Sequence, residues 1–162
     1  GVSCAVLGSG EPCTGDPARR AGNEALVQML AAQAIDTLTE AKPQKIVVSC
    51  AHCFNTIAGE YPELGGSFDV VHHTQLLNRL VRDGLLTPVA PASAASTAPT
   101  GADTTDEAGA QPAGNAPSVG APLKVTYHDA CFLGRHNRVY EPPRELVGSL
   151  PNVEPVEMPR NR

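Results

Sequence analysis

The feature that most constrains the fold is a short apolar run that ends in two closely spaced cysteines. Residues 45–49 (KIVVS) are rich in β-branched side chains and predict a buried strand, and Cys50 and Cys53 follow it directly with the spacing CxxC. A helix is expected to begin at Ala51 or His52, so both sulfurs would lie near backbone N–H groups at the positive end of a helix dipole. This position favours thiolates, which bind metals or carry out redox chemistry.

The composition restricts the class of protein. The chain has 162 residues, of which 41% are hydrophobic, and it has no Trp and only three Phe and three Tyr, so its core must be aliphatic. This is typical of one ordinary domain in which helices cover a parallel sheet. The net charge is −5, with Lys and Arg scattered along the chain, which argues against a nucleic-acid binder. We expect no spanning segment and no secretory signal in this stretch, and we expect it to be part of a longer chain.

Strands and helices are expected to alternate along the chain. The expected strands are residues 2–7, 45–49, 68–72 and 123–127. The expected helices run from Asp16-Pro17 to about Thr39, from the CxxC turn to Tyr61-Pro62, from Thr74 to Gly84, and over 142–150. This order predicts an α/β fold, with a parallel sheet and crossover helices arranged in Rossmann-like βαβ units.

Residues 88–122 interrupt this pattern, because the segment consists mainly of Ala, Pro, Gly, Ser and Thr and contains no aromatic residue, Lys or Arg. Such a composition cannot bury enough apolar surface to offset the entropy lost on ordering. We therefore expect a disordered insert that separates residues 1–87 from residues 123–162.

Four cysteines are expected to share one site. Cys13 lies in a Gly-rich loop, Cys50 and Cys53 follow one strand, and Cys131 follows another. Because ligands bind at the carboxyl ends of parallel strands, all four thiols would reach the same edge if these strands are neighbours. Soft thiolates suit an Fe–S cluster or zinc. Cys4 lies inside the first expected strand and is expected in the core. An odd number of cysteines argues against a disulfide framework and favours a reducing compartment.

Two alternatives use fewer of these thiols. His128 and Cys131 have the spacing HxxC and could complete a structural Cys3His zinc site with Cys50 and Cys53, in a domain that mainly binds other subunits. A dithiol exchange protein would use Cys50 and Cys53 alone. The first alternative leaves Cys13 without a role, and the second also leaves Cys131 without one.

Other polar residues near the thiols are expected to have smaller roles. Arg19, Arg20 and Arg135 lie within a few residues of a thiol and could stabilise an anionic cluster, or they could form an ordinary solvated basic surface. His52 is expected to face solvent or to donate a hydrogen bond to sulfur. A structural role is expected for His72 and His73, and none for His136. No side chain is expected to act as a general acid or base.

Several sequence runs together resemble the cysteine-rich CCG-domain Fe–S oxidoreductases, which include heterodisulfide reductase subunits B and D. The runs are CTGDPARRAGNE (13–24), SCAHCFNTIAGEYPELGG (49–66), VVHHTQLL (70–77) and YHDACFLGRHNRVYEPPREL (127–146). The chain is most similar to the membrane-bound bacterial Fe–S reductases that are linked to electron transfer flavoprotein and the quinone pool.

The resemblance implies a cofactor, its ligands and a cellular setting. Cys13 matches the CCG position and Cys50 and Cys53 the CxxC of a first cysteine-rich repeat in residues 1–87, which lacks its leading cysteine. Cys131 matches the leading cysteine of a second repeat that begins in residues 123–162. The family implies a [4Fe–4S]-type cluster that passes electrons from a flavoprotein toward a quinone or disulfide. It also implies a place at the cytoplasmic face of the bacterial plasma membrane, with the membrane contact made by parts outside this chain.

Overall fold

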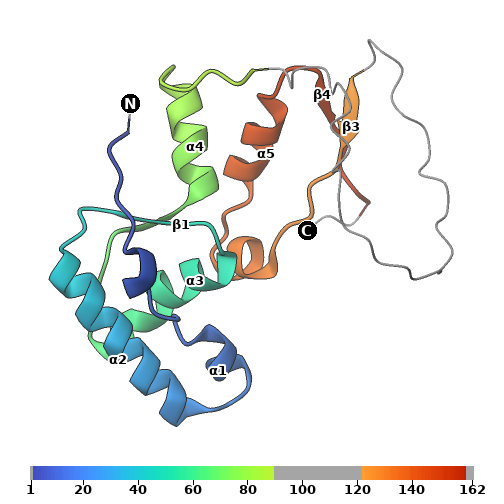
Figure 1. Cartoon of the computed structure of the whole chain (residues 1–162). Coiled ribbons are helices and arrows are strands. Elements are labelled where there is room, and N and C mark those ends of the chain that lie inside the picture. The colour runs from blue at the N-terminus through green and yellow to red at the C-terminus, as the bar shows by residue number, and fades with distance from the viewer. Residues whose placement is uncertain (1, 90–121, 160–162) are drawn as a thin grey trace, which may run out of the picture.

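In the computed structural model, residues 2–89 and 122–159 are described, and short helices accompany two small parallel sheets (Figure 1). The predicted insert, residues 88–122, lies outside the described residues except at its two ends. The fold is thus mixed α/β in the described part of the chain. It has two separate two-stranded sheets instead of the one continuous sheet expected. The larger Rossmann-like arrangement stays a prediction.

The first sheet pairs β1 (Ile46–Val48) with β2 (Val70–His72) in parallel, with Val47 opposite Val71. The connection between them is helical throughout most of its length: α3 (Ala51–Asn55), the π-helical η2 (Thr56–Glu60) and the 3₁₀ helix η3 (Tyr61–Leu64). The predicted helix start at Ala51 is confirmed. Pro62 does not stop the helical path as expected, because it lies in the first turn of η3, where proline is tolerated.

The long helix predicted from residue 16 to residue 39 is divided into two. The short α1 (Asp16–Arg20) is followed by α2 (Glu24–Ala41). Gly22 lies between them with a φ of +76°, a conformation that L side chains rarely adopt. Asn23 then restarts the helix, because its side chain accepts a 3.2 Å hydrogen bond from the Leu26 N–H.

The predicted first strand is wrong. Residues 2–7 form no strand and lead into a 3₁₀ turn, η1 (Gly8–Gly10). Within the described part of the chain β1 pairs only with β2, so the backbone of residues 2–7 has no ladder to join. Cys4 is consequently exposed, and Val6 is 87% exposed, so the prediction that Cys4 belongs to the core is also wrong.

The remaining elements join the part of the chain before the insert to the part after it. The helix α4 (His73–Arg82) begins one residue earlier than expected, with His72 as its N-cap. After the insert come β3 (Leu123–Val125), the π-helical η4 (Phe132–His136), α5 (Glu141–Gly148) and β4 (Val153–Pro155). The strands β3 and β4 pair in parallel, and β4 was not predicted because three residues that include a proline give almost no strand signal.

Two apolar clusters hold these elements together. In the first, Ala31 and Ala34 of α2 pack against Ile57 and Tyr61. In the second, Phe54 of α3 packs against Leu133 and Val139, so residues from before and after the insert share one core. The helices α4 and α5 also lie side by side (Figure 1).

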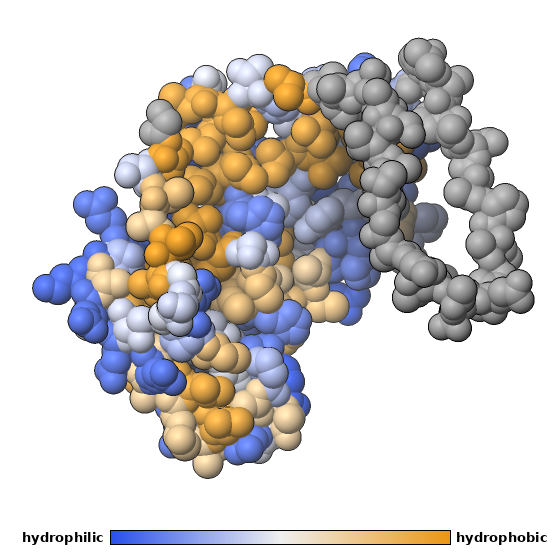
Figure 2. Space-filling view, viewed as in Figure 1, coloured by the Kyte–Doolittle hydropathy of each residue, from blue (hydrophilic) through white to orange (hydrophobic). Residues whose placement is uncertain are grey.

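One face of the molecule is notably apolar. Figure 2 shows hydrophobic residues gathered over the region of the N-terminal segment, β1 and α4. Val6, Val47 and Leu85 are 87%, 46% and 75% exposed, respectively. The expected parallel sheet covered by helices is therefore covered incompletely in the described part of the chain, with Val47 on the open face of β1.

Candidate functional site

The CxxC turn is built at the end of β1. After Val48 the chain turns at Ser49, and Cys50 becomes the N-cap of α3 with an extended backbone, φ −96° and ψ 127°. Its carbonyl oxygen accepts a 2.9 Å hydrogen bond from the Phe54 N–H, which closes the first turn of the helix. Cys50 is exposed, whereas Cys53 lies in the helix and is half-buried.

The loop that carries Cys13 is held against this turn by its next residue. The hydroxyl of Thr14 donates a hydrogen bond of 3.7 Å to the Cys53 Sγ. The buried Tyr61 hydroxyl donates a 3.0 Å bond to the Thr14 carbonyl oxygen, and Gly15, with a φ of +89°, then turns the chain into α1. The structure therefore brings the Cys13 loop to the CxxC turn, although the two are 39 residues apart at the Thr14–Cys53 contact.

The charges of these thiols affect one another. Burial raises the pKa of the Cys53 thiol, the Thr14 hydrogen bond lowers it, and the negative charges of Cys50 and Cys13 raise it again. Burial, followed by the charges of Cys53 and Cys13, raises the pKa of Tyr61 to about 12. For Cys53 the direction is thus opposite to the predicted favoured thiolate, because burial raises the pKa and the charges of Cys50 and Cys13 add to it. A bound cation would reverse this balance.

Cys131 is the N-cap residue of η4, which packs against α3, and it is exposed. Leu133 and Val139 anchor this segment in the second apolar cluster together with Phe54. The structure thus brings the segment of Cys131 against α3, but no contact joins the Cys131 sulfur to the other sulfurs in the described part of the chain. His128, the fourth ligand of the alternative zinc site, is exposed.

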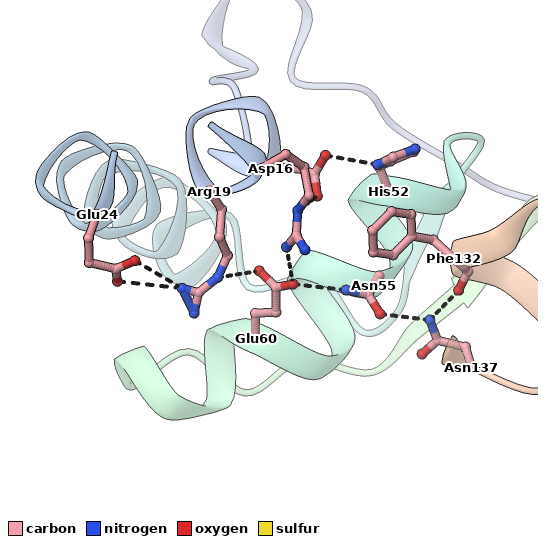
Figure 3. A network of polar contacts seen from close by, with 9 residues as sticks. Asp16, Arg19, Glu24, His52, Asn55, Glu60, Phe132 and Asn137 are labelled. Carbon is pink, nitrogen blue, oxygen red and sulfur yellow. Dashed lines mark hydrogen bonds and ion pairs between the residues drawn. The ribbon is translucent and has the colours of Figure 1, made fainter. Parts of the chain in front are cut away.

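A network of polar contacts connects the three cysteine segments, which are the Cys13 loop with the start of α1, the CxxC turn with α3, and Cys131 with η4 (Figure 3). The His52 Nδ1 lies 2.8 Å from the Asp16 Oδ2, and the Arg20 Nε lies 3.2 Å from the Asp16 Oδ1. Arg19 and Arg20 both pair with Glu60, at 2.9 Å and 2.6 Å. His52 therefore binds a carboxylate through Nδ1 while its side chain is 50% exposed, which agrees with the predicted position facing solvent; the contact with Asp16 was not predicted.

The same network reaches the segment of Cys131 through Phe132. The Phe132 ring centroid lies 4.3 Å from that of His52, 4.6 Å from that of His136 and 5.1 Å from the Arg20 Cζ. On the backbone side, the Asn137 Nδ2 donates to the Phe132 carbonyl oxygen at 2.5 Å and to the Asn55 Oδ1 at 3.0 Å.

The predicted basic residues are thus in different situations. Arg19 and Arg20 are largely neutralised by Asp16, Glu24 and Glu60. Arg135 lies in η4 and is exposed.

The thiols are not assembled around a single ion. Within residues 2–89 and 122–159, no three His, Cys, Asp or Glu side chains lie close enough together to hold one metal ion. The Cys3His zinc alternative is therefore not preformed there. An Fe–S cluster requires a different geometry. Its thiolates bind different iron atoms, so their sulfurs lie further apart than the ligands of a single metal ion. The donor set of the described chain fits such a cluster in chemistry, since the only soft ligands gathered near the CxxC turn are thiols.

Comparison with known proteins assigns the family. A family model for the CCG cysteine-rich domain matches residues 1–58 and 125–162, which contain all the cysteines of the chain. The chain belongs to the CCG cysteine-rich domain family. The resemblance drawn from the sequence runs is confirmed. No solved structure matches this CCG chain.

Three curated proteins are similar to this CCG chain over nearly its full length. The EtfAB:quinone oxidoreductase of Syntrophomonas wolfei is 38% identical over 91% of the chain and 16% of the relative. The probable iron-sulfur-binding oxidoreductase FadF of Bacillus subtilis is 37% identical over 100% of the chain and 19% of the relative. The probable membrane-anchored ferredoxin of Chromohalobacter salexigens is 36% identical over 99% of the chain and 20% of the relative.

The chain thus spans at most about a fifth of the length of these relatives. In the portion of the chain that the structure describes, none of the helices combines the length and the apolar character needed to cross a bilayer.

Proposed function

We propose that this chain is an electron-transfer domain of an iron–sulfur oxidoreductase. The single observation that carries the proposal is the approach of the Cys13 loop to the CxxC turn, where Thr14 donates to the Cys53 Sγ and the thiol charges act on one another. Thiolates brought close together repel one another, and a cationic centre bound between them stabilises the deprotonated forms. When bound, an Fe–S cluster supplies one-electron redox chemistry.

Cys13, Cys50, Cys53 and Cys131 are the proposed ligands. Cys13 lies in a loop outside the helices, and Cys50 and Cys131 are exposed N-cap residues, so none of these three sulfurs is fixed inside a helix or in the core. Cys53 is fixed in α3 and provides the rigid ligand. In this proposal residues 1–87 and 123–162 are two cysteine-rich repeats that contribute to one site, and a [4Fe–4S] cluster is the proposed type.

The chain's own polar residues would prepare this site. The Tyr61 hydroxyl holds the Thr14 carbonyl oxygen, and the Thr14 hydroxyl is directed at the Cys53 sulfur, so the loop and the turn stay together without metal. Among the arginines, Arg20 is the one whose charge lies beside the ring of Phe132, next to Cys131. Arg135 and Arg19 would contribute positive charge from further away.

The proposed electron donor is an electron transfer flavoprotein, and the proposed acceptor is a quinone. The support is the name of the Syntrophomonas wolfei relative, EtfAB:quinone oxidoreductase. Quinones are apolar and stay in the bilayer, and the Chromohalobacter salexigens relative is named a membrane-anchored ferredoxin. The proposal therefore puts the domain at the cytoplasmic face of the membrane, within a larger protein. A disulfide acceptor is the alternative outcome.

The test is metal analysis of the full-length protein purified without oxygen. Wild-type protein should contain iron and acid-labile sulfide and absorb broadly in the visible range. Cys53→Ser should lose the cluster of this domain, because serine removes the soft ligand, while Cys4→Ser, at an exposed cysteine outside the proposed ligand set, should keep it.

Other results would contradict the proposal. A colourless protein with stoichiometric zinc would support the Cys3His alternative, and unchanged iron in Cys53→Ser would remove Cys53 from the ligand set. Rapid mixing with reduced electron transfer flavoprotein tests the donor, since bleaching of the visible absorption reports electron arrival. A quinone analogue and a disulfide, added separately, then show which acceptor restores the colour.

A further inference from the structure

The three cysteine segments contact one another mainly through residues that are adjacent to the cysteines in the sequence. His52 lies between Cys50 and Cys53 in the sequence, and Phe132 directly follows Cys131. The rings of these two neighbours are in contact, with a centroid distance of 4.3 Å and an interplanar angle of 47°. This ring contact is therefore a direct mechanical link between the CxxC turn and the segment of Cys131.

Phe132 is also fixed on its backbone side. The Asn137 Nδ2 donates to the Phe132 carbonyl oxygen and to the Asn55 Oδ1, and Asn55 lies in α3 two residues after Cys53. The ring stacks on His136 at 4.6 Å with an interplanar angle of 20°. Ring and carbonyl together set the orientation of Phe132 relative to α3 (Figure 3).

The link continues to the segment of Cys13. Asp16, three residues after Cys13, is buried and accepts from the His52 Nδ1 at 2.8 Å. Arg20 pairs with the same carboxylate and lies 5.1 Å from the Phe132 ring centroid. One continuous set of contacts thus runs from the Cys13 segment through His52 to the Cys131 segment.

The ring of Phe132 is not what anchors η4 in the core. Leu133, which is 1% exposed, and Val139 pack against Phe54 in the second apolar cluster, whereas Phe132 is only half-buried and is absent from that cluster. Removal of the ring should therefore leave η4 attached. It should free the orientation of the backbone at Cys131 relative to the CxxC turn.

We propose that Phe132 is a positioning residue that holds Cys131 at the correct place relative to Cys50 and Cys53 by packing on His52. This inference rests on the proposed cluster function. Residues that orient metal ligands without binding the metal commonly change metal affinity by about 10- to 100-fold when they are replaced. The role requires an aromatic ring at this position and no particular polar group.

The test compares three variants of the full-length protein, each purified without oxygen. Phe132→Leu should release iron to an added chelator about tenfold faster than wild type and should change the electron paramagnetic resonance spectrum of the reduced cluster. Phe132→Tyr keeps the ring and should restore both properties. Phe68→Leu is the matched control, since Phe68 packs against the first apolar cluster and not at the cysteine turns.

Circular dichroism and the unfolding midpoint, measured on the same samples, separate positioning from general destabilisation. The proposal is overturned if Phe132→Leu keeps wild-type iron release and spectrum, or if Phe68→Leu loses iron equally. Unfolding of Phe132→Leu, or failure of Phe132→Tyr to restore the site, would also overturn it. Absence of iron from the wild-type protein would instead contradict both the proposed function and this inference. That result can be distinguished from the variant results, in which the wild type contains iron.

Discussion

Among the individual residues, His72 shows how a buried polar side chain supports the cysteine turn. It is 4% exposed, with its Nε2 3.2 Å from the Ser49 carbonyl oxygen and its Nδ1 2.8 Å from the Thr74 Oγ1. Its side chain also accepts from the Gln75 backbone N–H in a capping box. A neutral ring with the proton on Nε2 satisfies all of these partners. Because Ser49 directly precedes Cys50, His72 fixes the start of the CxxC turn, in agreement with the structural role predicted for it.

Burial, and then the nearby His73, lowers the pKa of His72 in the folded chain, so acid should weaken the fold. Above the unfolded pKa of about 6.5, His72 is neutral in both states and contributes no pH dependence. Below that value the unfolded chain binds a proton that the folded chain resists, and stability falls until the lowered folded pKa is reached. The unfolding midpoint in urea, measured from about pH 8 down to about pH 5, should therefore decrease.

The substitution His72→Gln should make this pH dependence shallower. The exposed His128 provides the control, since His128→Gln should leave the slope of the wild type. A His72→Gln variant with the full wild-type slope would assign the acid sensitivity to another group.

Among the elements, α5 stabilises the turn that precedes Cys131, through a contact between Arg144 and Asp129. Arg144 forms a bidentate pair with Asp129, with Nη1–Oδ1 and Nη2–Oδ2 distances of 2.6 Å and 2.7 Å. It also binds Glu157 at 2.7 Å. The side chains of Arg144 and Asp129 are 12% and 9% exposed, and the hydrogen bond with Asp129, followed by that with Glu157, raises the pKa of Arg144. The pair thus connects α5 with residues 128–131 (HDAC) through two charged groups that are mostly buried.

Replacing Arg144 with Met should destabilise the domain by about 3 kcal/mol, because it leaves the Asp129 carboxylate buried without its cation. Arg79→Met is the control: Arg79 is 77% exposed and its ion pair with Asp83 should be worth at most about 1 kcal/mol. The measurement is the free energy of unfolding in urea. Adding Asp129→Asn to Arg144→Met should recover part of the loss, and an equal loss in Arg79→Met and Arg144→Met would contradict the argument.

The elements also show which parts of the fold were predictable. Residues 45–49 carry a local strand pattern, and the CxxC turn starts a helix where the strand ends, so β1 and α3 were found from sequence. Residues 2–7 carry an equally apolar pattern, but a strand exists only if another strand pairs with it, and a sequence does not reveal that partner. The division at Gly22 depends on a left-handed backbone conformation within a helical pattern, which the apolar spacing alone overlooked.

In the molecule as a whole, the two cysteine-bearing parts of the chain hold together by their own contacts. Phe54 shares an apolar cluster with Leu133 and Val139, and Asn78 of α4 donates a 2.6 Å hydrogen bond to Glu145 of α5. All of these contacts are made between residues 2–89 and residues 122–159. Residues far apart in sequence therefore find one another through packing.

Deleting residues 92–118 should consequently leave the unfolding midpoint and the iron content of the full-length protein unchanged. The remaining residues 88–91 (PVAP) and 119–122 (VGAP) keep a Pro-containing connection between the two parts. Reduction by electron transfer flavoprotein should also stay at the wild-type rate. A slower reduction with normal iron content would show that the insert binds a partner, and a loss of iron would contradict the independence of the two parts.

For the candidate site, the sequence proposes the cysteines but does not reveal the contacts of the residues around them. CxxC after a strand and a third thiol after another strand are patterns within single segments. From the sequence, Asp16 marks only the start of a helix, because its contact with His52 spans 36 residues. Phe132 and His136 gave no signal either, since an aromatic residue beside a cysteine has no meaning in the sequence until the opposite ring is known.

The exposure of Cys13, Cys50 and Cys131 has a consequence for how a cofactor held by them would behave. A redox centre at the rim of a protein exchanges electrons by tunnelling directly into whatever docks there, so no internal relay is required. The same openness admits dioxygen, which destroys unprotected iron–sulfur centres. A neighbouring protein seated on this rim would then serve two purposes at once, as the source of electrons and as a shield against air.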